Sequence, residues 1–178
     1  AVATDACADC GRNTYSSQDN TQCVACPSNS VSSTASSADT DCKCNVGYTG
    51  PDGGTCVACV AGKFKPTNGS DTCTLCAAGK YLGLLGATYD KCVQCPRNAT
   101  SPAGSDVISD CICVPGTTGT AHTESCEPCE AGKFKATAGS ADCALCSAGS
   151  YSAAGQSACT LCPTGGTSRI GSRNVADC

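Results

Sequence analysis

Cysteine is the residue whose abundance and spacing could do chemistry in this chain. There are 21 cysteines among 178 residues, and twenty of them form ten close pairs. Eight pairs have C-x2-C spacing and two have C-x-C spacing, with 11 to 15 residues between one pair and the next. Cysteines in such an arrangement can bind zinc, exchange disulfides or cross-link the chain. The pairs are Cys7/Cys10, Cys23/Cys26, Cys42/Cys44, Cys56/Cys59, Cys73/Cys76, Cys92/Cys95, Cys111/Cys113, Cys126/Cys129, Cys143/Cys146 and Cys159/Cys162, and Cys178 stands alone.

Zinc is the main alternative to disulfides for these pairs. Zinc ribbons use two C-x2-C pairs about 15 to 20 residues apart. The C-x-C pairs and the Gly-Tyr-Thr-Gly sequence at residues 47–50 are instead typical of disulfide modules. Intracellular zinc repeats also tend to carry charged surfaces, whereas only 15% of this chain is charged. A redox role is disfavoured because no βαβ pattern surrounds the pairs. We therefore expect structural disulfides, and neither a metal nor another cofactor.

The composition predicts a fold that disulfides hold together. Leu, Ile, Val and Phe make up about 12% of the residues, and Met and Trp are absent. Below about 20% of these residues, a chain does not normally bury enough apolar surface to offset its conformational entropy. A disulfide that closes a loop of about 15 residues contributes roughly 3 kcal/mol in the chain-entropy model. The expected fold is small and disulfide-rich: elongated tandem cysteine-rich repeats with short β-ribbons and loops, and no shared hydrophobic core.

The same disulfides predict the compartment. At this density they persist in an oxidising environment, so the protein is expected to be secreted and to lie outside the cell or on its surface. No apolar run approaches the roughly 18 residues of a membrane span, and we expect no part of this sequence to be a signal peptide. We expect no membrane insertion by this segment. A net charge of −4 spread along the chain argues against nucleic acid as a partner.

Side chains suited to catalysis are scarce. His122 is the only histidine and lies in a predicted loop, so a solvated side chain is expected. The acids Asp5, Asp39, Asp41 and Asp71 lack the spacing of a calcium loop and are expected to act as turn and cap residues. We therefore expect that the protein is not an enzyme.

An internal repeat underlies the cysteine pairs. The four cysteines within residues 56–76 recur 70 residues later within 126–146. The local sequence recurs as well, because Ala-Gly-Lys-Phe-Lys at 61–65 returns at 131–135. Each such unit is expected to be one member of a tandem array.

The order of the pairs divides the chain into three repeats. We expect a partial repeat at 1–44, a full repeat at 45–113, and a repeat at 114–178 that stops before its last cysteine. An array cut within a repeat lacks polar caps, and uncapped ends invite continuation by another copy. On this reasoning the protein self-assembles, and the leftover Cys7 could reach a neighbouring subunit. A segment of a longer single-chain ectodomain is the alternative.

Two kinds of loop alternate within a repeat. In one kind, an aromatic residue follows a cysteine pair by five positions and a glycine precedes it by two, as in Gly62 and Phe64. The glycine permits a positive-φ turn, and the ring is expected to cover the adjacent disulfide. Lys63 and Lys65 flank this ring, and Lys133 and Lys135 flank the equivalent ring of the next repeat; all four lysines are expected to be solvated. In the other kind, Cys-Pro opens a Ser/Thr/Ala/Gly-rich run that ends in Asp-Cys, as at Asp41.

These features together resemble a known family. The run Cys56-x2-Cys59-x2-Gly62-Lys63-Phe64…Cys73-x2-Cys76, then Cys92-x2-Cys95-Pro96…Cys111-x-Cys113-x2-Gly116, resembles the ephrin-receptor-like cysteine-rich module. That module is related in pattern to EGF-like and TNF-receptor repeats and also recurs in surface proteins of protists. The resemblance covers essentially the whole chain, with an extra C-x2-C pair in each unit as a departure. It implies an extracellular rod or spacer, sometimes with ligand contacts, without enzymatic activity.

Parity favours a sequential pairing of the disulfides. If the second cysteine of each pair bonds to the first cysteine of the next, only Cys7 is left over. Local crossing, such as Cys73–Cys92 with Cys76–Cys95, is the alternative and is the EGF-like arrangement. The sequential pairing predicts Cys10–Cys23, Cys26–Cys42, Cys44–Cys56, Cys59–Cys73, Cys76–Cys92, Cys95–Cys111, Cys113–Cys126, Cys129–Cys143, Cys146–Cys159 and Cys162–Cys178.

Two asparagines match the N-glycosylation sequon. They are Asn68 in Asn-Gly-Ser and Asn98 in Asn-Ala-Thr, both in predicted surface loops. In an extracellular protein we expect glycans at Asn68 and Asn98.

Two functions remain open. The first is an extracellular structural repeat protein that forms a rod, coat or fibre at the cell surface and can assemble into filaments. Bland Ala, Ser, Thr and Gly loops favour it, because binding hot spots are typically Trp, Tyr and Arg. The second is a ligand-binding or adhesive segment of a receptor-like ectodomain, with another surface protein as partner. The candidate contact is the apolar run of Tyr81, Leu82, Leu84 and Leu85, which either packs on the neighbouring repeat or mediates self-association.

Overall fold

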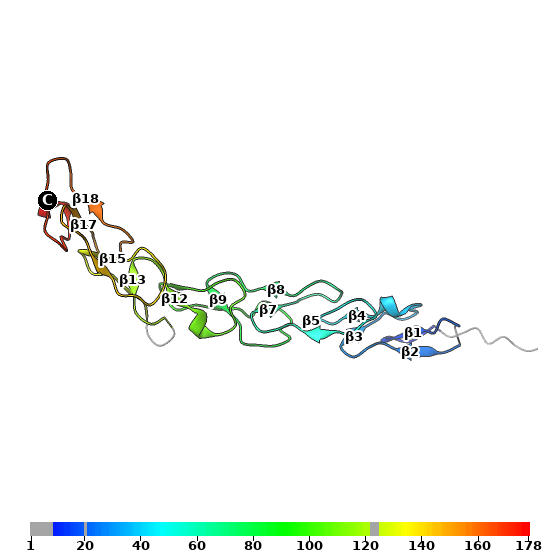
Figure 1. The fold of residues 1–178 in the computed structure, drawn as a ribbon. Helices are drawn as coiled ribbons and strands as arrows, with labels where there is room; N and C mark the ends of the chain where they lie inside the picture. Colours follow the sequence, from blue (N-terminus) through cyan, green and yellow to red (C-terminus); the bar gives the residue numbers. More distant parts are fainter. Residues whose placement is uncertain (1–8, 20, 122–124) are drawn as a thin grey trace, which may run out of the picture. The chain divides into compact units, whose positions relative to one another are not determined.

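Short antiparallel ribbons make up the regular structure. The computed structural model describes residues 9–19, 21–121 and 125–178. In these ranges each strand has two or three residues and pairs antiparallel with one other strand (Figure 1). Three single 3-10 turns complete the regular structure: η1 (Asp39–Asp41), η2 (Ile108–Asp110) and η3 (Val175–Asp177). Strands this short present too little surface for a layered core.

The cysteine pairs determine where the ribbons form. The second strand of every ribbon consists of residues within or at a cysteine pair, and the first strand lies in the loop before it. In β7 (Lys63–Phe64) and β8 (Thr74–Leu75), for example, Lys63 faces Leu75 and Phe64 faces Thr74. β8 fills the gap between Cys73 and Cys76. The ribbon therefore closes the loop that the disulfide then locks.

The chain forms two compact units. One unit extends to Cys76 and includes Leu82–Cys92, and the other comprises Ala77–Tyr81 and Val93–Cys178. The ribbons of the first unit are β1 (Thr14–Ser16) with β2 (Cys23–Ala25), β3 (Ser30–Val31) with β4 (Lys43–Cys44), β5 (Tyr48–Thr49) with β6 (Val57–Ala58), and β7 with β8. Those of the second unit are β9 (Lys80–Tyr81) with β10 (Val93–Gln94), β11 (Ala99–Thr100) with β12 (Ile112–Cys113), β13 (Thr117–Thr118) with β14 (Glu127–Pro128), β15 (Lys133–Phe134) with β16 (Ala144–Leu145), and β17 (Ser150–Tyr151) with β18 (Thr160–Leu161).

Ten disulfides join the described cysteines in sequential order. Each links the second cysteine of one pair to the first of the next, with Cα–Cα distances of 5.5 to 5.8 Å. These separations are ordinary for disulfides. The bonds are Cys10–Cys23, Cys26–Cys42, Cys44–Cys56, Cys59–Cys73 and Cys76–Cys92 in the first unit, and Cys95–Cys111, Cys113–Cys126, Cys129–Cys143, Cys146–Cys159 and Cys162–Cys178 in the second. This arrangement agrees with the sequential prediction and differs from the crossed one. Cys7 lies outside the described residues.

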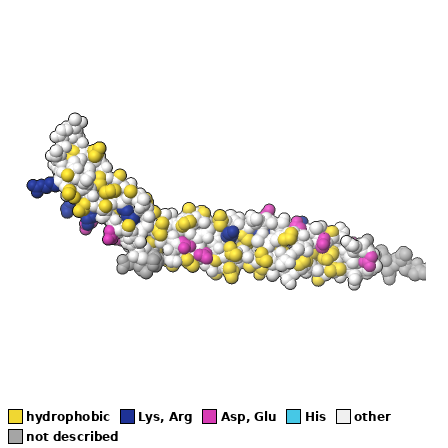
Figure 2. Space-filling model, in the orientation of Figure 1, with side chains coloured by type: hydrophobic (Ala, Val, Ile, Leu, Met, Phe, Trp, Pro, Cys, Tyr) yellow, Lys and Arg dark blue, Asp and Glu magenta, His cyan; other side chains and the backbone are white. Residues whose placement is uncertain are grey.

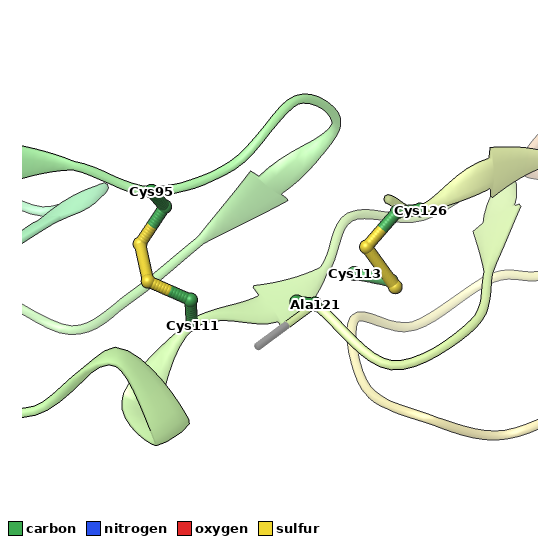
Figure 3. Packing of buried hydrophobic residues seen from close by; sticks show 5 residues of the cluster. All are labelled: Cys95, Cys111, Cys113, Ala121 and Cys126. Carbon is green, nitrogen blue, oxygen red and sulfur yellow. A yellow bond between two sulfur atoms is a disulfide. The ribbon is translucent and has the colours of Figure 1, made fainter. Parts of the chain in front are cut away.

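Half-cystines are the majority of the buried hydrophobic residues in the described ranges. One small cluster in the second unit contains the Cys95–Cys111 and Cys113–Cys126 disulfides, with Ala121 between them (Figure 3). Elsewhere hydrophobic side chains are scattered over the surface that Figure 2 shows, among uncharged polar groups. The small disulfide-rich fold without a large shared core, which the composition predicts, is thus confirmed.

The described residues show neither a membrane-spanning helix nor a cluster of metal ligands. Among the described residues, no helix is long and apolar enough to cross a membrane. Within the same ranges, no group of three or more His, Cys, Asp or Glu side chains is arranged to hold a metal ion.

Candidate functional site

A recurring contact between consecutive loops is the most distinctive site in this fold. It starts at a residue with positive φ just before a ribbon, such as Gly47 with φ 77°. Glycine adopts this conformation without a Cβ penalty. The Gly47 N–H donates to the carbonyl of Lys65 at 2.9 Å, and the Gly47 carbonyl accepts from the Cys59 N–H at 2.8 Å. One turn residue is therefore bound both to its own ribbon partner and to the next loop.

The side chain of Lys65 completes this contact. Lys65 follows strand β7 directly and is only 1% exposed. Its Nζ donates to the carbonyl of Tyr48 at 2.7 Å and to the carbonyl of Gly69 at 2.5 Å. The backbone carbonyl of Lys65 therefore accepts a hydrogen bond from Gly47, and the Lys65 side chain donates one to Tyr48, the residue after Gly47. We call this pair of hydrogen bonds, one backbone and one from the side chain, the loop clamp.

The loop clamp recurs along the chain with serine in place of lysine. Ser32 accepts from the Asn13 N–H, and its hydroxyl donates to the Thr14 carbonyl at 2.9 Å. Ser101 binds Gly79 and Lys80 in the same way, with its hydroxyl 2.8 Å from the Lys80 carbonyl. The remaining serine clamps are Ser152 on Gly132 and Lys133, and Ser168 on Gly149 and Ser150. The second lysine clamp is Lys135 on Gly116 and Thr117, with a further bond to Gly139.

The buried lysines differ from the sequence prediction. Lys65 and its repeat equivalent Lys135 were expected to be solvated, and that expectation is wrong, because they are 1% and 4% exposed. Burial lowers the pKa of both ammonium groups, since removal from water disfavours the charged form, while Asp71 near Lys65 and Asp142 near Lys135 act in the opposite direction. Backbone carbonyls serve as acceptors for the buried charge. Lys63, on the other side of the ring, is half-buried.

Aromatic rings also connect consecutive loops. Phe64 lies in the loop closed by Cys59–Cys73 but packs against the cluster of Cys76, Leu82 and Ala87, with Cys92 beside it. Tyr81 likewise packs against the cluster that contains the Cys95–Cys111 disulfide of the following loop. The prediction that rings cover disulfides holds in these two cases, and the disulfide concerned belongs to the next loop.

Aspartates before a cysteine terminate the 3-10 turns. The Asp41 carboxylate accepts from the N–H groups of Ser37 and Ala38, at 2.8 and 3.1 Å. Asp110 and Asp177 accept from two N–H groups in the same way. These hydrogen bonds, led by that of Ser37, hold the pKa of Asp41 below its ordinary value. Asp41 is therefore a capping residue, as the sequence pattern predicts.

The two sequon asparagines have different surroundings. Asn68 is exposed, and its Oδ1 accepts from the Val46 N–H at 3.0 Å. Asn98 is half-buried with φ 57°, and its Nδ2 donates to the Cys126 carbonyl at 2.9 Å. The sequence motif is the same at both sites, but the structure engages the oxygen of one side chain and the nitrogen of the other.

The apolar segment proposed for self-association is divided by the structure. Leu82 is 2% exposed and packs in the cluster with Cys76, so its inclusion in an exposed patch is wrong. Tyr81 is half-buried. Leu84 and Leu85 are 51% and 72% exposed. Cys7, the other residue of that prediction, and His122 lie outside the described residues.

The loop clamp was not predicted from the sequence. A signal was present: a Ser or Lys directly follows the first strand of a ribbon at Ser32, Lys65, Ser101, Lys135 and Ser152. Each of these side chains is buried. The cysteines that could have bound zinc are paired in disulfides wherever the structure describes them, so the site is one of structural contact between loops.

Comparison with known proteins agrees with this architecture. The sequence pattern of the family described as "Tyrosine-protein kinase ephrin type A/B receptor-like" matches residues 47–91, 116–153 and 139–178. These segments cover more than half of the chain. No curated protein matches it.

Proposed function

Because the chain belongs to the ephrin type A/B receptor-like family of cysteine-rich repeats, we propose that it serves as a spacer in a coat or fibre at the cell surface. It is a disulfide-rich, receptor-like ectodomain segment, which implies a location outside the cell or on its surface. In this proposal the stacked loops supply length and stiffness, and they neither catalyse a reaction nor require a cofactor.

The loop clamp is the observation that carries the proposal. Buried donors such as Lys65, Ser101 and Lys135 bind the loop before them. Specific polar groups in the interior are thus used to attach one loop to the next. Contacts limited to neighbouring units are typical of repeat arrays, in which stability adds up along the chain. A chain so built is suited to holding its two ends apart.

One loop carries exposed apolar side chains that could support self-association. Leu84, Leu85 and Tyr89 are 51%, 72% and 56% exposed and lie within one loop, with Lys91 stacked on the Tyr89 ring at 4.6 Å. The disulfide that closes this loop joins cysteines 16 residues apart in sequence. The equivalent disulfide, Cys146–Cys159, joins cysteines 13 residues apart. Exposed apolar side chains on a repeat protein favour association with a second copy. We propose that this loop mediates lateral contact between spacers.

Adhesion to a different surface protein is the second candidate. Tyr89, with Lys91 stacked on its ring, favours it, because tyrosine is enriched in binding hot spots. Its occupant would be another protein and not a second copy of this chain.

Sedimentation and electron microscopy of the purified secreted protein distinguish these proposals. We expect concentration-dependent association that is lost in the double variant Leu84→Ser/Leu85→Ser. The matched control is Leu161→Ser, which removes a leucine that is 79% exposed in another loop. Association that persists in the double variant would contradict the assigned contact. A protein that stays monomeric at all concentrations would contradict lateral assembly, and the spacer would then act without binding a second copy.

A further inference from the structure

The two sequons are not equivalent, and we propose that Asn68 is the glycan acceptor of this chain while Asn98 is a structural residue that stays unmodified. The inference rests on the proposed extracellular function, because N-linked glycans are added in the secretory pathway. It goes further by assigning different roles to two copies of one motif.

Asn68 is presented to solvent by an ordered loop. The Gly69 N–H donates to the Cys44 carbonyl at 2.8 Å, and the Gly69 carbonyl accepts from the buried Lys65. The Asn68 side chain uses its Oδ1 atom to accept from Val46. Its Nδ2, the atom that carries an N-linked sugar, belongs to an exposed residue. A glycan on Nδ2 therefore leaves the Val46 hydrogen bond intact.

The equivalent loop of the next repeat explains why asparagine is present at this position. There, Pro115 takes the place of Val46 and Ala138 takes the place of Asn68. Proline has no N–H to donate, so no acceptor is needed at Ala138. Ala138 is exposed as well, and Gly139 and Ser140 follow it. The second loop thus offers the same backbone without the acceptor amide.

Asn98 uses its amide nitrogen inside the structure. Its Nδ2 donates to the Cys126 carbonyl, 28 residues away, and its backbone carbonyl accepts from the Val114 N–H at 3.0 Å. Thr100, the third residue of the sequon, is half-buried in strand β11. A sugar on Nδ2 would occupy the space beside the Cys126 carbonyl. Modification of Asn98 therefore opposes the closure of this loop.

The sugar donor in the transfer reaction is an oligosaccharide linked to a lipid pyrophosphate. The Asn68 Nδ2 attacks C1 of the first sugar, and the N–C1 bond forms as the C1–O bond to pyrophosphate breaks. The lipid pyrophosphate leaves with the bonding electron pair, and Nδ2 gives one proton to a base of the transferase. One N–H remains on the nitrogen, and Oδ1 is unchanged.

Site-resolved mass spectrometry of the chain secreted from animal cells tests the proposal. Glycosidase treatment in heavy-oxygen water labels each modified asparagine, and the same incubation without the glycosidase gives the background from spontaneous deamidation of Asn68, which precedes Gly69. We expect label at Asn68 in most chains and at Asn98 in few. Ser70→Ala should remove the glycan, whereas Thr100→Val should leave the mass unchanged. Ala138→Asn, which creates Asn-Gly-Ser in the equivalent exposed loop, should add a second glycan.

The outcomes separate this proposal from the function on which it rests. Secretion with sequential disulfides but without a glycan at Asn68 overturns the acceptor assignment alone. Occupancy at Asn98 equal to that at Asn68 overturns the role given to the Cys126 contact. Failure of the chain to be secreted overturns the extracellular function and the acceptor assignment together.

Discussion

Gly47 and Gly86 approach so closely that a Cβ atom on Gly47 would lie 2.3 Å from the carbonyl oxygen of Gly86. The same relationship recurs between Gly116 and Gly155, where the corresponding distance is 2.2 Å. In each case the two glycines belong to different disulfide loops. Backbone therefore packs directly on backbone between loops that are next but one in the sequence. The loop between them in sequence carries the clamp residue, Lys65 or Lys135.

Substitution of Gly47 tests this packing. Gly47→Ala should destabilise the fold by about 1–3 kcal/mol beyond the cost of its positive φ, because overpacking separates the two backbones. Gly149→Ala is the matched control: φ is 79° there, against 77° at Gly47, and no atom lies within 4 Å of the added carbon. The control substitution should lower the free energy of unfolding by only roughly 1–2 kcal/mol, the cost of a left-handed backbone conformation for alanine.

Denaturant unfolding with the disulfides intact, monitored by near-ultraviolet circular dichroism, measures the free energy of unfolding of each variant. Amide exchange of Gly86, whose N–H donates to the Cys59 carbonyl at 2.8 Å, reports on the contact itself. Equal costs for the Gly47 and Gly149 variants would show that the close approach contributes nothing.

Removal of a buried lysine tests the loop clamp. Lys65→Met keeps an unbranched side chain of similar length but leaves the Tyr48 and Gly69 carbonyls without their donor. An unsatisfied buried acceptor costs about 1–3 kcal/mol, so we expect a loss of stability in that range. The amide of Gly69 should also exchange faster. Lys63→Met, on the half-buried position two residues earlier, is the control and should change little. Wild-type stability of Lys65→Met would argue that the buried charge is dispensable.

Acid sensitivity should be linked to Asp41. Hydrogen bonds from Ser37 and Ala38 hold its folded-state pKa below the ordinary value of 3.8. The folded state therefore binds its proton less readily than the unfolded state does. This contribution to stability is present above about pH 3.8 and is lost as pH falls through the lowered pKa. Stability measured against pH for the parent and for Asp41→Asn should converge in acid. Parallel curves down to pH 2 would contradict the assignment.

The sequence predicts the cross-links and caps well because local spacing determines them. Loops of similar length leave few partners for each cysteine, and the aspartate before a cysteine is placed to cap the turn that ends there. Leu82, Lys65 and Asn98 are different. Their burial depends on carbonyls or side chains contributed by other loops, and residue type alone indicates a solvated lysine or an accessible amide. The direction in which Phe64 packs also depends on the following loop.

The spacer proposal requires that the chain extend well beyond a globule of its length. A compact domain of 178 residues has a radius of gyration of roughly 16 Å. Loops that bind chiefly their neighbours in sequence cannot pack around one centre, so small-angle X-ray scattering of the monomer should give a clearly larger radius and an end-to-end distance on the order of 100 Å. A radius of gyration near 16 Å in dilute solution, with the ten disulfides intact, would contradict the account.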